Sequence, residues 1–259
     1  MDRPQALLHR LDEIGQSLAR SGEALALLGL GSAGQELDRL DAYSDLDFFA
    51  IVKPGRKAAF LADLGWLSDI QPIAYRFRNT QDGYKVLFED GIFCEFAIFE
   101  EAELATAVFA PGRVIWKAEG FDETLLTPRP AAPPAARDIE WAVGEAVTCL
   151  YVGLCRYRRG EKLSAARFVQ QYAVDRIVEL SHVLEAEQAA NPDPFARERR
   201  YEARFPGLAR ELPQFVQGYE RTPESARAIL QFLAARFDVN PAMQRAILAL
   251  CDEQGKLGT

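Results

Sequence analysis

The sequence contains few cysteine and histidine residues. Its 259 residues include four cysteines and two histidines, His9 and His182. No two cysteines form a C-x-x-C pair and each lies in an apolar stretch, so we expect four reduced thiols rather than disulfides or a zinc site. Two histidines also exclude a metal centre built from several imidazoles. These absences leave open a metal site made of oxygen ligands.

Long hydrophobic runs are also lacking. No stretch reaches the roughly 18 uninterrupted apolar residues that a membrane-spanning helix needs. Residues 1–20 predict an amphipathic helix that carries acidic side chains, unlike a signal peptide. We therefore expect a cytoplasmic protein with no membrane partner. The composition, 49% hydrophobic and 26% charged, is typical of a globular chain with one large or two modest domains.

Positive charge is scarce in the first half of the chain. Residues 1–130 contain 21 Asp and Glu against 13 Lys and Arg, a net charge of −8, whereas residues 131–259 contain 17 of each. A negative surface repels the phosphate backbone of nucleic acids. We therefore do not expect a nucleic-acid partner, and a cationic or neutral small molecule fits better.

A glycine-rich turn follows the first predicted strand. Residues 24–28 predict a short buried strand, and the glycines of the run GLGSAG, residues 29–34, let the backbone turn and approach a ligand closely. Ser32 and the following residues 33–40 predict a short helix. The free N–H groups of that helix and the Ser32 hydroxyl can bind an anion.

Two aspartates begin the next predicted strand. Asp45 and Asp47 flank the start of residues 46–52, and alternate residues of a strand project from one face, about 7 Å apart. Two such carboxylates repel each other unless a cation lies between them, and Mg²⁺ prefers oxygen ligands of this kind. The alternative is that Asp45 caps a turn and Asp47 is a solvated strand residue.

A third carboxylate lies in a later apolar strand. Glu95 is the one charged residue of residues 91–99, so we expect a central strand in which a cation, a proton or an arginine neutralises it. Residues 84–88 predict its antiparallel neighbour, joined by a turn that contains Asp-Gly. If the Glu95 strand lies beside the Asp45 strand, three carboxylates converge. The structural alternative is an ion pair of Glu95 with Arg76, Arg78 or Lys85.

These residues together resemble a known superfamily. Gly31-Ser32, twelve further residues, Asp45-Leu46-Asp47 and then Glu95 are similar to the pattern of nucleotidyltransferases related to DNA polymerase beta. The strings YSDLDFF and CEFAIF also resemble kanamycin and lincosamide nucleotidyltransferases. The resemblance implies that Gly31 and Ser32 hold a triphosphate and that Asp45, Asp47 and Glu95 bind two Mg²⁺ ions. ATP or another nucleoside triphosphate would be the co-substrate, with Ser44 as a further nucleotide-binding candidate.

The same glycine turn fits the dinucleotide-binding pattern G-x-G-x-x-G. That motif needs a full crossover helix and an acidic residue at the far end of the second strand. Only ten residues, 35–44, separate Gly34 from Asp45, and the acidic pair lies at the start of its strand. The dinucleotide alternative is therefore rejected.

A proline-rich and alanine-rich segment divides the chain. Residues 127–137 contain four prolines and predict a linker between a nucleotidyltransferase catalytic domain, residues 1–127, and a helical substrate-binding bundle, residues 137–259. The expected fold class is α+β, a small mixed β-sheet flanked by helices followed by an α-helical bundle. The predicted helices after the linker cover residues 138–159, 164–190, 207–219, 223–237 and 241–254.

The first helix after the linker carries two candidate general bases. Glu140 or Glu145 can take the proton from an acceptor hydroxyl, and the alternative is that both are solvated. Arg158 and its basic neighbours can contact triphosphate, but we favour a role at the end of a helix. Arg176 and His182 fit the spacing of some helical ribonucleases, although a packed helix explains them better.

The function predicted from the sequence is a metal-dependent nucleotidyltransferase. It would move a nucleoside monophosphate, AMP from ATP, onto a hydroxyl of a small molecule and release pyrophosphate. The resemblance suggests a lincosamide-type or aminoglycoside-type antibiotic as that molecule. The alternatives are a non-catalytic nucleotide-binding or regulatory module and a nucleotidyltransferase that acts on a protein or tRNA. A homodimer is expected if the helical half exposes an apolar face.

Overall fold

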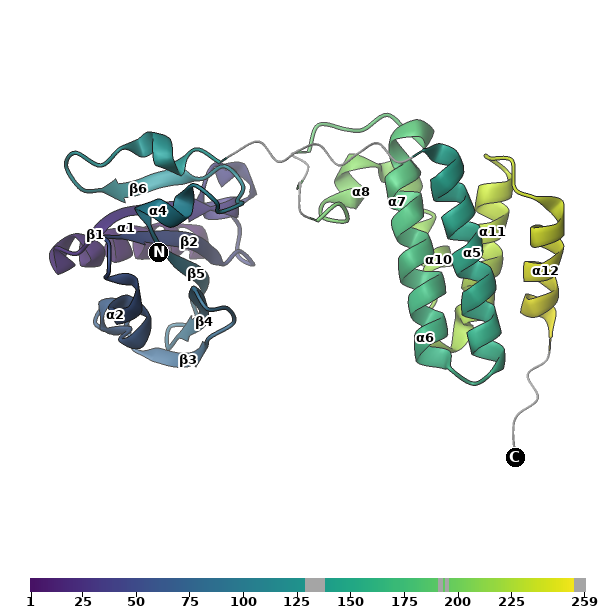
Figure 1. Cartoon of the computed structure of the whole chain (residues 1–259), viewed down its shortest axis with the longest axis horizontal. Helices are drawn as coiled ribbons and strands as arrows, with labels where there is room; N and C mark the ends of the chain where they lie inside the picture. Colours follow the sequence, from purple (N-terminus) through teal and green to yellow (C-terminus); the bar gives the residue numbers. More distant parts are fainter. Residues whose placement is uncertain (129–137, 191–192, 194–195, 254–259) are drawn as a thin grey trace. The chain divides into compact units, whose positions relative to one another are not determined.

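The chain forms two compact units. The computed structural model describes residues 1–128, 138–190, 193 and 196–253. One unit comprises Met1–Ala131 and the other Ala132–Thr259, called here the N-terminal unit and the helical unit (Figure 1). The predicted linker lies outside the described residues except for its first two positions. Among the described residues, no helix is both long and apolar enough to span a bilayer.

The N-terminal unit is built on a six-stranded mixed sheet in the order β3-β4-β5-β2-β1-β6. Its strands are β1 (Ala24–Leu30), β2 (Leu46–Val52), β3 (Ile73–Phe77), β4 (Gly83–Phe88), β5 (Phe93–Glu100) and β6 (Arg113–Lys117). The central neighbours β2 and β5 are parallel, whereas the other pairs are antiparallel. The α+β fold class is confirmed, and the predicted strands of Asp47 and Glu95 lie side by side.

The two faces of the sheet are covered unequally. One face packs against α1 (Arg3–Ser21), α2 (Lys57–Ala62) and α3 (Gly65–Ser68), and its core includes Phe48, Phe96 and Ile98. The other face carries a smaller cluster that includes Leu28 and Ile51, beside α4 (Glu101–Leu104) and η3 (Glu123–Leu126). Asp47 and Glu95, near the starts of their strands, belong to neither cluster. That end of the second face is therefore open for a site.

Helix α1 anchors the unit. Its apolar residues Leu7, Leu11, Ile14 and Leu18 recur at helical spacing and are fully buried. Asp2 caps its start by accepting a hydrogen bond from the backbone N–H of Gln5 at 2.9 Å. The amphipathic helix predicted for residues 1–20 is confirmed.

The helix predicted after Ser32 is wrong. The segment contains only two short 3₁₀ turns, η1 (Gly31–Ala33) and η2 (Leu37–Arg39). Gly34 breaks any helical path because its backbone has φ −91° and ψ −113°, and a Cβ there would lie 2.6 Å from the Gly29 carbonyl oxygen. The turn therefore has no α-helical N-terminus to offer an anion.

In its described residues, the helical unit contains four longer helices and several short ones. The longer ones are α5 (Ile139–Arg158), α7 (Ala173–Leu184), α11 (Thr222–Ala234) and α12 (Pro241–Asp252). The short ones are α6 (Lys162–Arg167), the π-helical η4 (Phe168–Tyr172), α8 (Tyr201–Arg204), α9 (Pro206–Ala209), α10 (Leu212–Phe215) and η5 (Tyr219–Arg221). Their apolar faces share one buried cluster around Leu150, Ile177 and Leu233. The C-terminal helical region is confirmed.

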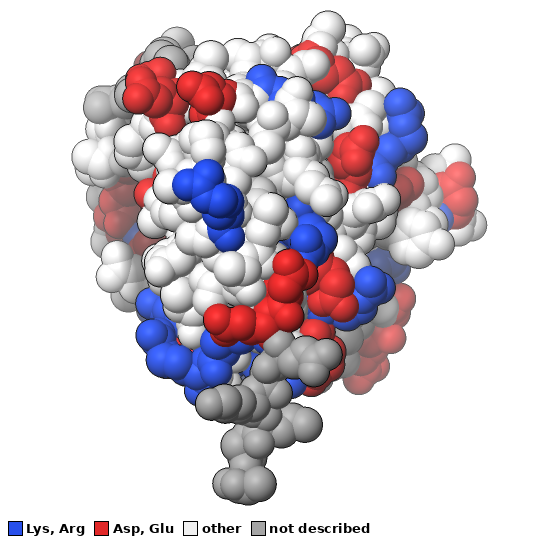
Figure 2. All heavy atoms as spheres, turned by 90° about the vertical axis from the view of Figure 1, so that its right-hand side faces the viewer, with Lys and Arg blue, Asp and Glu red and all other residues white. Residues whose placement is uncertain are grey.

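One predicted start of these helices differs from the structure, and another agrees with it. The helix predicted from Ser164 begins earlier, at Lys162, and Ser164 instead accepts a hydrogen bond from Arg156. Asn240 does cap α12, because its Oδ1 accepts from the N–H groups of Ala242 and Met243 at 2.9 and 3.3 Å. Figure 2 shows acidic and basic side chains mixed over the face that carries α12, in keeping with the balanced charge of residues 131–259.

Candidate active site

Four side chains form a row across the open face of the sheet. Asp47 on β2 is the direct partner of Glu95 on β5, Glu95 is the partner of Lys85 on β4, and Lys85 is the partner of Phe77 on β3. Direct partners on neighbouring strands project from the same face, and the strands lie about 4.8 Å apart. We call Asp47, Glu95, Lys85 and Phe77 the cross-strand row. It places two carboxylates, one ammonium group and one exposed ring along a single line.

Both carboxylate oxygens of Glu95 have donors from the chain itself. Lys85 Nζ lies 3.0 Å from Oε2, and Asn79 Nδ2 donates to Oε1 at 2.7 Å. The Glu95 side chain is 40% exposed, so it is half-buried rather than enclosed in the core. Of the three basic residues that could pair with Glu95, Arg76, Arg78 and Lys85, the structure places Lys85 on it.

The charges of the row act on one another. The pKa of Lys85 is raised above its ordinary value, first by the hydrogen bond to Glu95 and then by the Glu95 charge. The carboxylates of Asp47 and Asp45 also raise the pKa of Lys85. All three predicted carboxylates therefore lie within the electrostatic reach of one lysine.

The glycine turn lies beside Asp47. Gly31 has φ +55°, and a Cβ at this position would lie 3.5 Å from Asp47 Oδ2. Glycine therefore leaves space next to the carboxylate in a conformation that other residues rarely adopt. The Gly31 carbonyl accepts hydrogen bonds from the N–H groups of Gly34 and Glu36, which fixes the turn, and Ser32 follows directly.

Asp45 and Ser44 lie at the entry to β2. Asp45 is exposed and immediately precedes the strand. The Ser44 hydroxyl donates to Asp41 Oδ1 at 3.1 Å, and the Ser44 N–H donates to the Asp41 carbonyl at 3.3 Å. Ser44 thus stabilises the turn that delivers Asp45 to the sheet. Its predicted contact with nucleotide stays a prediction.

The carboxylates of the cross-strand row can bind Mg²⁺ as a pair of ligands. Within the described part of the chain, no group of three or more His, Cys, Asp or Glu side chains is placed to hold a metal ion. Mg²⁺ commonly binds through one or two carboxylates and completes its shell with phosphate oxygens and water. Asp47 and its partner Glu95 supply such a pair of oxygen ligands. The residues fit a metal that arrives together with a triphosphate.

The two candidate bases on α5 belong to the helical unit. Glu140 and Glu145 are both exposed. Glu140 lines a pocket of about 740 Å³, and Glu145 does not. Of the three candidates for the general base, Glu95 belongs to the cross-strand row, whereas Glu140 and Glu145 belong to the other unit.

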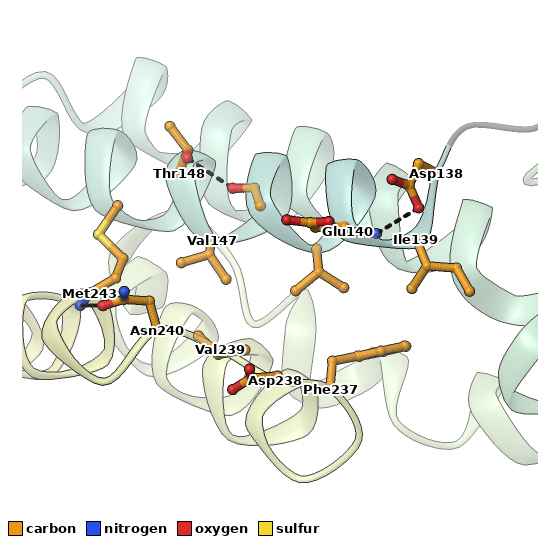
Figure 3. A pocket seen from close by; sticks show the side chains of 12 residues that line it. Asp138, Ile139, Glu140, Val147, Thr148, Phe237, Asp238, Val239, Asn240 and Met243 are labelled. Atoms are coloured by element: carbon orange, nitrogen blue, oxygen red, sulfur yellow. Dashed lines mark hydrogen bonds between the residues drawn. The ribbon is translucent and has the colours of Figure 1, made fainter.

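That pocket combines apolar and acidic groups. It lies between the first half of α5 and the segment that joins α11 to α12, and Ile139 and Val147 point from α5 toward that segment (Figure 3). Three of its lining residues are acidic: Asp138, Glu140 and Asp238. The other lining residues are Ile139, Val143, Gly144, Val147, Thr148, Phe237, Val239, Asn240 and Met243. A small molecule with an apolar body and a positive charge would match this lining.

The basic residues at the end of α5 have structural partners. Arg158 Nε donates to the Leu250 carbonyl at 2.8 Å, near the end of α12, and Lys162 Nζ lies 2.6 Å from Glu220 Oε2. The structure thus gives Arg158 the favoured role at a helix end, although the helix is α12 rather than α5. His182 is exposed, so the packed position predicted for it is wrong; its Nδ1 lies 2.8 Å from the Glu179 carbonyl on its own helix.

Three residues in or beside the cross-strand row, Asn79, Phe77 and Tyr75, were not predicted from the sequence. Asn79 lies in the loop before β4 and has no motif around it that marks it as a partner of Glu95. Phe77 and Tyr75 are 52% and 53% exposed on the edge strand β3. The alternation of Tyr75 and Phe77 with Arg76 could have indicated that both rings lie on one face of a strand, because alternate residues of a strand share a face.

The whole chain has only a weak likeness to known proteins. No protein-family model and no curated protein matches the sequence. One similar solved structure is an aminoglycoside 6-adenyltransferase from Bacillus subtilis, with 14% identity and a TM-score of 0.33 over 93% of this chain and 89% of that chain. A second is the Thermotoga maritima CCA-adding enzyme complexed with tRNA, with 12% identity and a TM-score of 0.34 over 95% of this chain and 72% of that chain. TM-scores this low carry no argument about function.

Proposed function

We propose that the chain is a metal-dependent nucleotidyltransferase. It moves a nucleoside monophosphate, AMP from ATP, onto a hydroxyl of a small molecule and releases pyrophosphate. The observation that supports this best is the direct pairing of Asp47 with Glu95, with Gly31 leaving space beside Asp47. A bound triphosphate needs carboxylates for its cation and a turn that lets phosphate approach the backbone, and one unit supplies both.

The proposed roles follow from these positions. Asp47 and Glu95 supply the paired ligands for one or two Mg²⁺ ions, Asp45 at the entry to β2 joins them once the triphosphate brings the metal, and Gly31 and Ser32 face the triphosphate. Bound Mg²⁺ supplies charge stabilisation for the attacking and leaving oxygens of an in-line displacement at the α-phosphorus. The glycine at position 31 permits the close approach, because it leaves the space beside Asp47 Oδ2 unfilled.

We propose that the acceptor is a small molecule which binds to the helical unit. A pocket of about 740 Å³ is within the size range of sites for drug-sized ligands. Its carboxylates favour an amine-bearing compound, such as an aminoglycoside-type or lincosamide-type antibiotic. A tRNA acceptor is less favoured, because the net charge of residues 1–130 is −8 and repels a phosphate backbone.

The test is transfer of label from ATP. The purified chain is incubated with α-labelled ATP, Mg²⁺ and fractionated cell extract, and products are identified by mass spectrometry together with pyrophosphate release. The proposal predicts an adenylylated small molecule from the wild-type protein and none from Asp47→Asn, with both proteins equally folded. Equal turnover by Asp47→Asn would show that Asp47 is not a metal ligand. Label on protein or tRNA would show that the acceptor is a macromolecule rather than a small molecule.

A second candidate is a non-catalytic nucleotide-binding module. The engagement of both Glu95 oxygens by Lys85 and Asn79 favours it, because a carboxylate that only stabilises the fold has its donors within the chain. Such a module would bind ATP and release no pyrophosphate with any extract fraction. The transfer assay therefore separates the two functions.

A further inference from the structure

Lys85 holds the third carboxylate of the site by direct contact. Its Nζ lies 3.0 Å from Glu95 Oε2, and the two residues are register partners within the β4–β5 hairpin. The pair is therefore formed by a local unit of the fold. Its geometry follows from the hairpin and needs no ligand.

The amide of Asn79 lies on the other oxygen of Glu95. Its Nδ2 donates to Oε1 at 2.7 Å, while in the described structure its Oδ1 is buried without a hydrogen-bond partner. A buried amide oxygen without a donor is costly, and cations are its natural partners. The immediate surroundings of Glu95 thus already contain one cation and an amide whose oxygen lacks a hydrogen-bond partner.

A divalent ion and the Lys85 ammonium group compete for the same place. Asp47 faces Glu95 from the next strand, so the position between these two carboxylates attracts any nearby cation. An ion bound there repels the ammonium group on Glu95. The Lys85 side chain is 41% exposed and has a flexible stem, so it can leave Glu95 without disturbing the sheet.

We propose that Lys85 is a tethered cation that neutralises Glu95 in the metal-free protein and must leave it before a divalent ion binds. This inference rests on the proposed function, because it presupposes a metal site at Asp47 and Glu95. Lys85 is a positioning residue here, since it acts through the carboxylate. One consequence is that ATP and the divalent ion bind cooperatively, because the phosphates of ATP offer the displaced Lys85 ammonium group a new partner.

The test measures metal affinity without chemistry. Mn²⁺ binding to the full chain is followed by electron paramagnetic resonance at constant pH, without nucleotide, for the wild-type protein and Lys85→Met. The matched control is Lys53→Met, which removes the same charge at the far end of β2, where Lys53 Nζ donates to the Gly22 carbonyl. We expect Lys85→Met to bind Mn²⁺ about three- to fivefold more tightly, the equivalent of one exposed ion pair, and Lys53→Met to bind like the wild type.

Two further measurements separate competition from a general charge effect. In a Glu95→Gln background, Lys85→Met should no longer tighten Mn²⁺ binding, because the contested carboxylate is gone. ATP should tighten Mn²⁺ binding more in the wild type than in Lys85→Met. Circular dichroism checks folding, and Lys85→Gln replaces Lys85→Met if the latter does not fold.

The outcomes distinguish the two proposals. Equal or weaker Mn²⁺ binding by Lys85→Met, beside a wild type that does bind, overturns the role of Lys85 and leaves the proposed function standing. An equal gain in Mn²⁺ affinity in Lys53→Met would show that the effect is a general charge effect rather than competition for Glu95. That result also leaves the proposed function standing. No Mn²⁺ binding in any variant, with or without ATP, overturns the metal site and the proposed function together.

Discussion

Replacing Gly31 with alanine separates backbone strain from loss of the ligand site. Gly31 has φ +55°, where alanine costs about 1 kcal/mol relative to glycine. The added Cβ would lie 3.5 Å from Asp47 Oδ2, in the space that the account assigns to phosphate and metal. We therefore expect a small loss of folding free energy and a large loss of Mg²⁺-dependent ATP binding. Losing one charged contact is worth about 1.5 to 3 kcal/mol, or roughly a tenfold to hundredfold rise in Kd.

Gly22 provides the matched control. It has φ +66° at the end of α1, and nothing lies within 4 Å of an added Cβ. Gly22→Ala should therefore lose about the same 1 kcal/mol of folding free energy in urea unfolding as Gly31→Ala. Calorimetric titration with ATP and Mg²⁺ should show wild-type affinity for Gly22→Ala only. Wild-type affinity in Gly31→Ala would refute the placement of the triphosphate.

Three further variants test the fold around the site and the second unit. Gly83→Ala should cost about 3 kcal/mol in urea unfolding, because its Cβ would lie 1.9 Å from the Phe96 carbonyl oxygen and force two strands apart. Burial raises the pKa of the Cys149 thiol from 9.0 to about 11, so its stabilising contribution is complete below pH 9.0 and is lost as the pH rises toward 11. The free energy of unfolding of the wild type should therefore fall more steeply between pH 9 and 11 than that of Cys149→Ala. Parallel curves of unfolding free energy against pH would contradict the raised pKa of Cys149. Arg158→Ala should lose about 1 to 3 kcal/mol because carbonyls near the end of α12 lose their donor. Arg159→Ala, which loses only an exposed ion pair, should lose under about 1 kcal/mol in the same thermal unfolding experiment.

The strands of the site were predictable because their signals are local. Short apolar runs after Asp45 and around Glu95 predict strands, and Asp90-Gly91 predicts the hairpin, whose Gly91 has φ +82°. The centre of that turn also fixes the register, since equal steps in both directions reach Lys85 and Glu95. Counting outward from the turn would have selected Lys85 from the three basic residues considered.

Other features depended on distant parts of the chain. The pairing of Asp47 with Glu95 joins strands separated by about forty residues, so no local pattern sets its register. The expected helix after Ser32 failed because Gly34 packs against the Gly29 carbonyl, a contact that helix propensity ignores. The pocket of the helical unit likewise joins α5 to the turn before α12, which sequence spacing alone does not bring together.

The most direct test of the central claim is a crystal structure with Mn²⁺ and a non-hydrolysable ATP analogue. We expect anomalous density for manganese at Asp47 and Glu95, the triphosphate against Gly31 and Ser32, and the Lys85 ammonium group away from Glu95. Ordered nucleotide and manganese elsewhere, with Lys85 still on Glu95, would show that the metal site is misplaced.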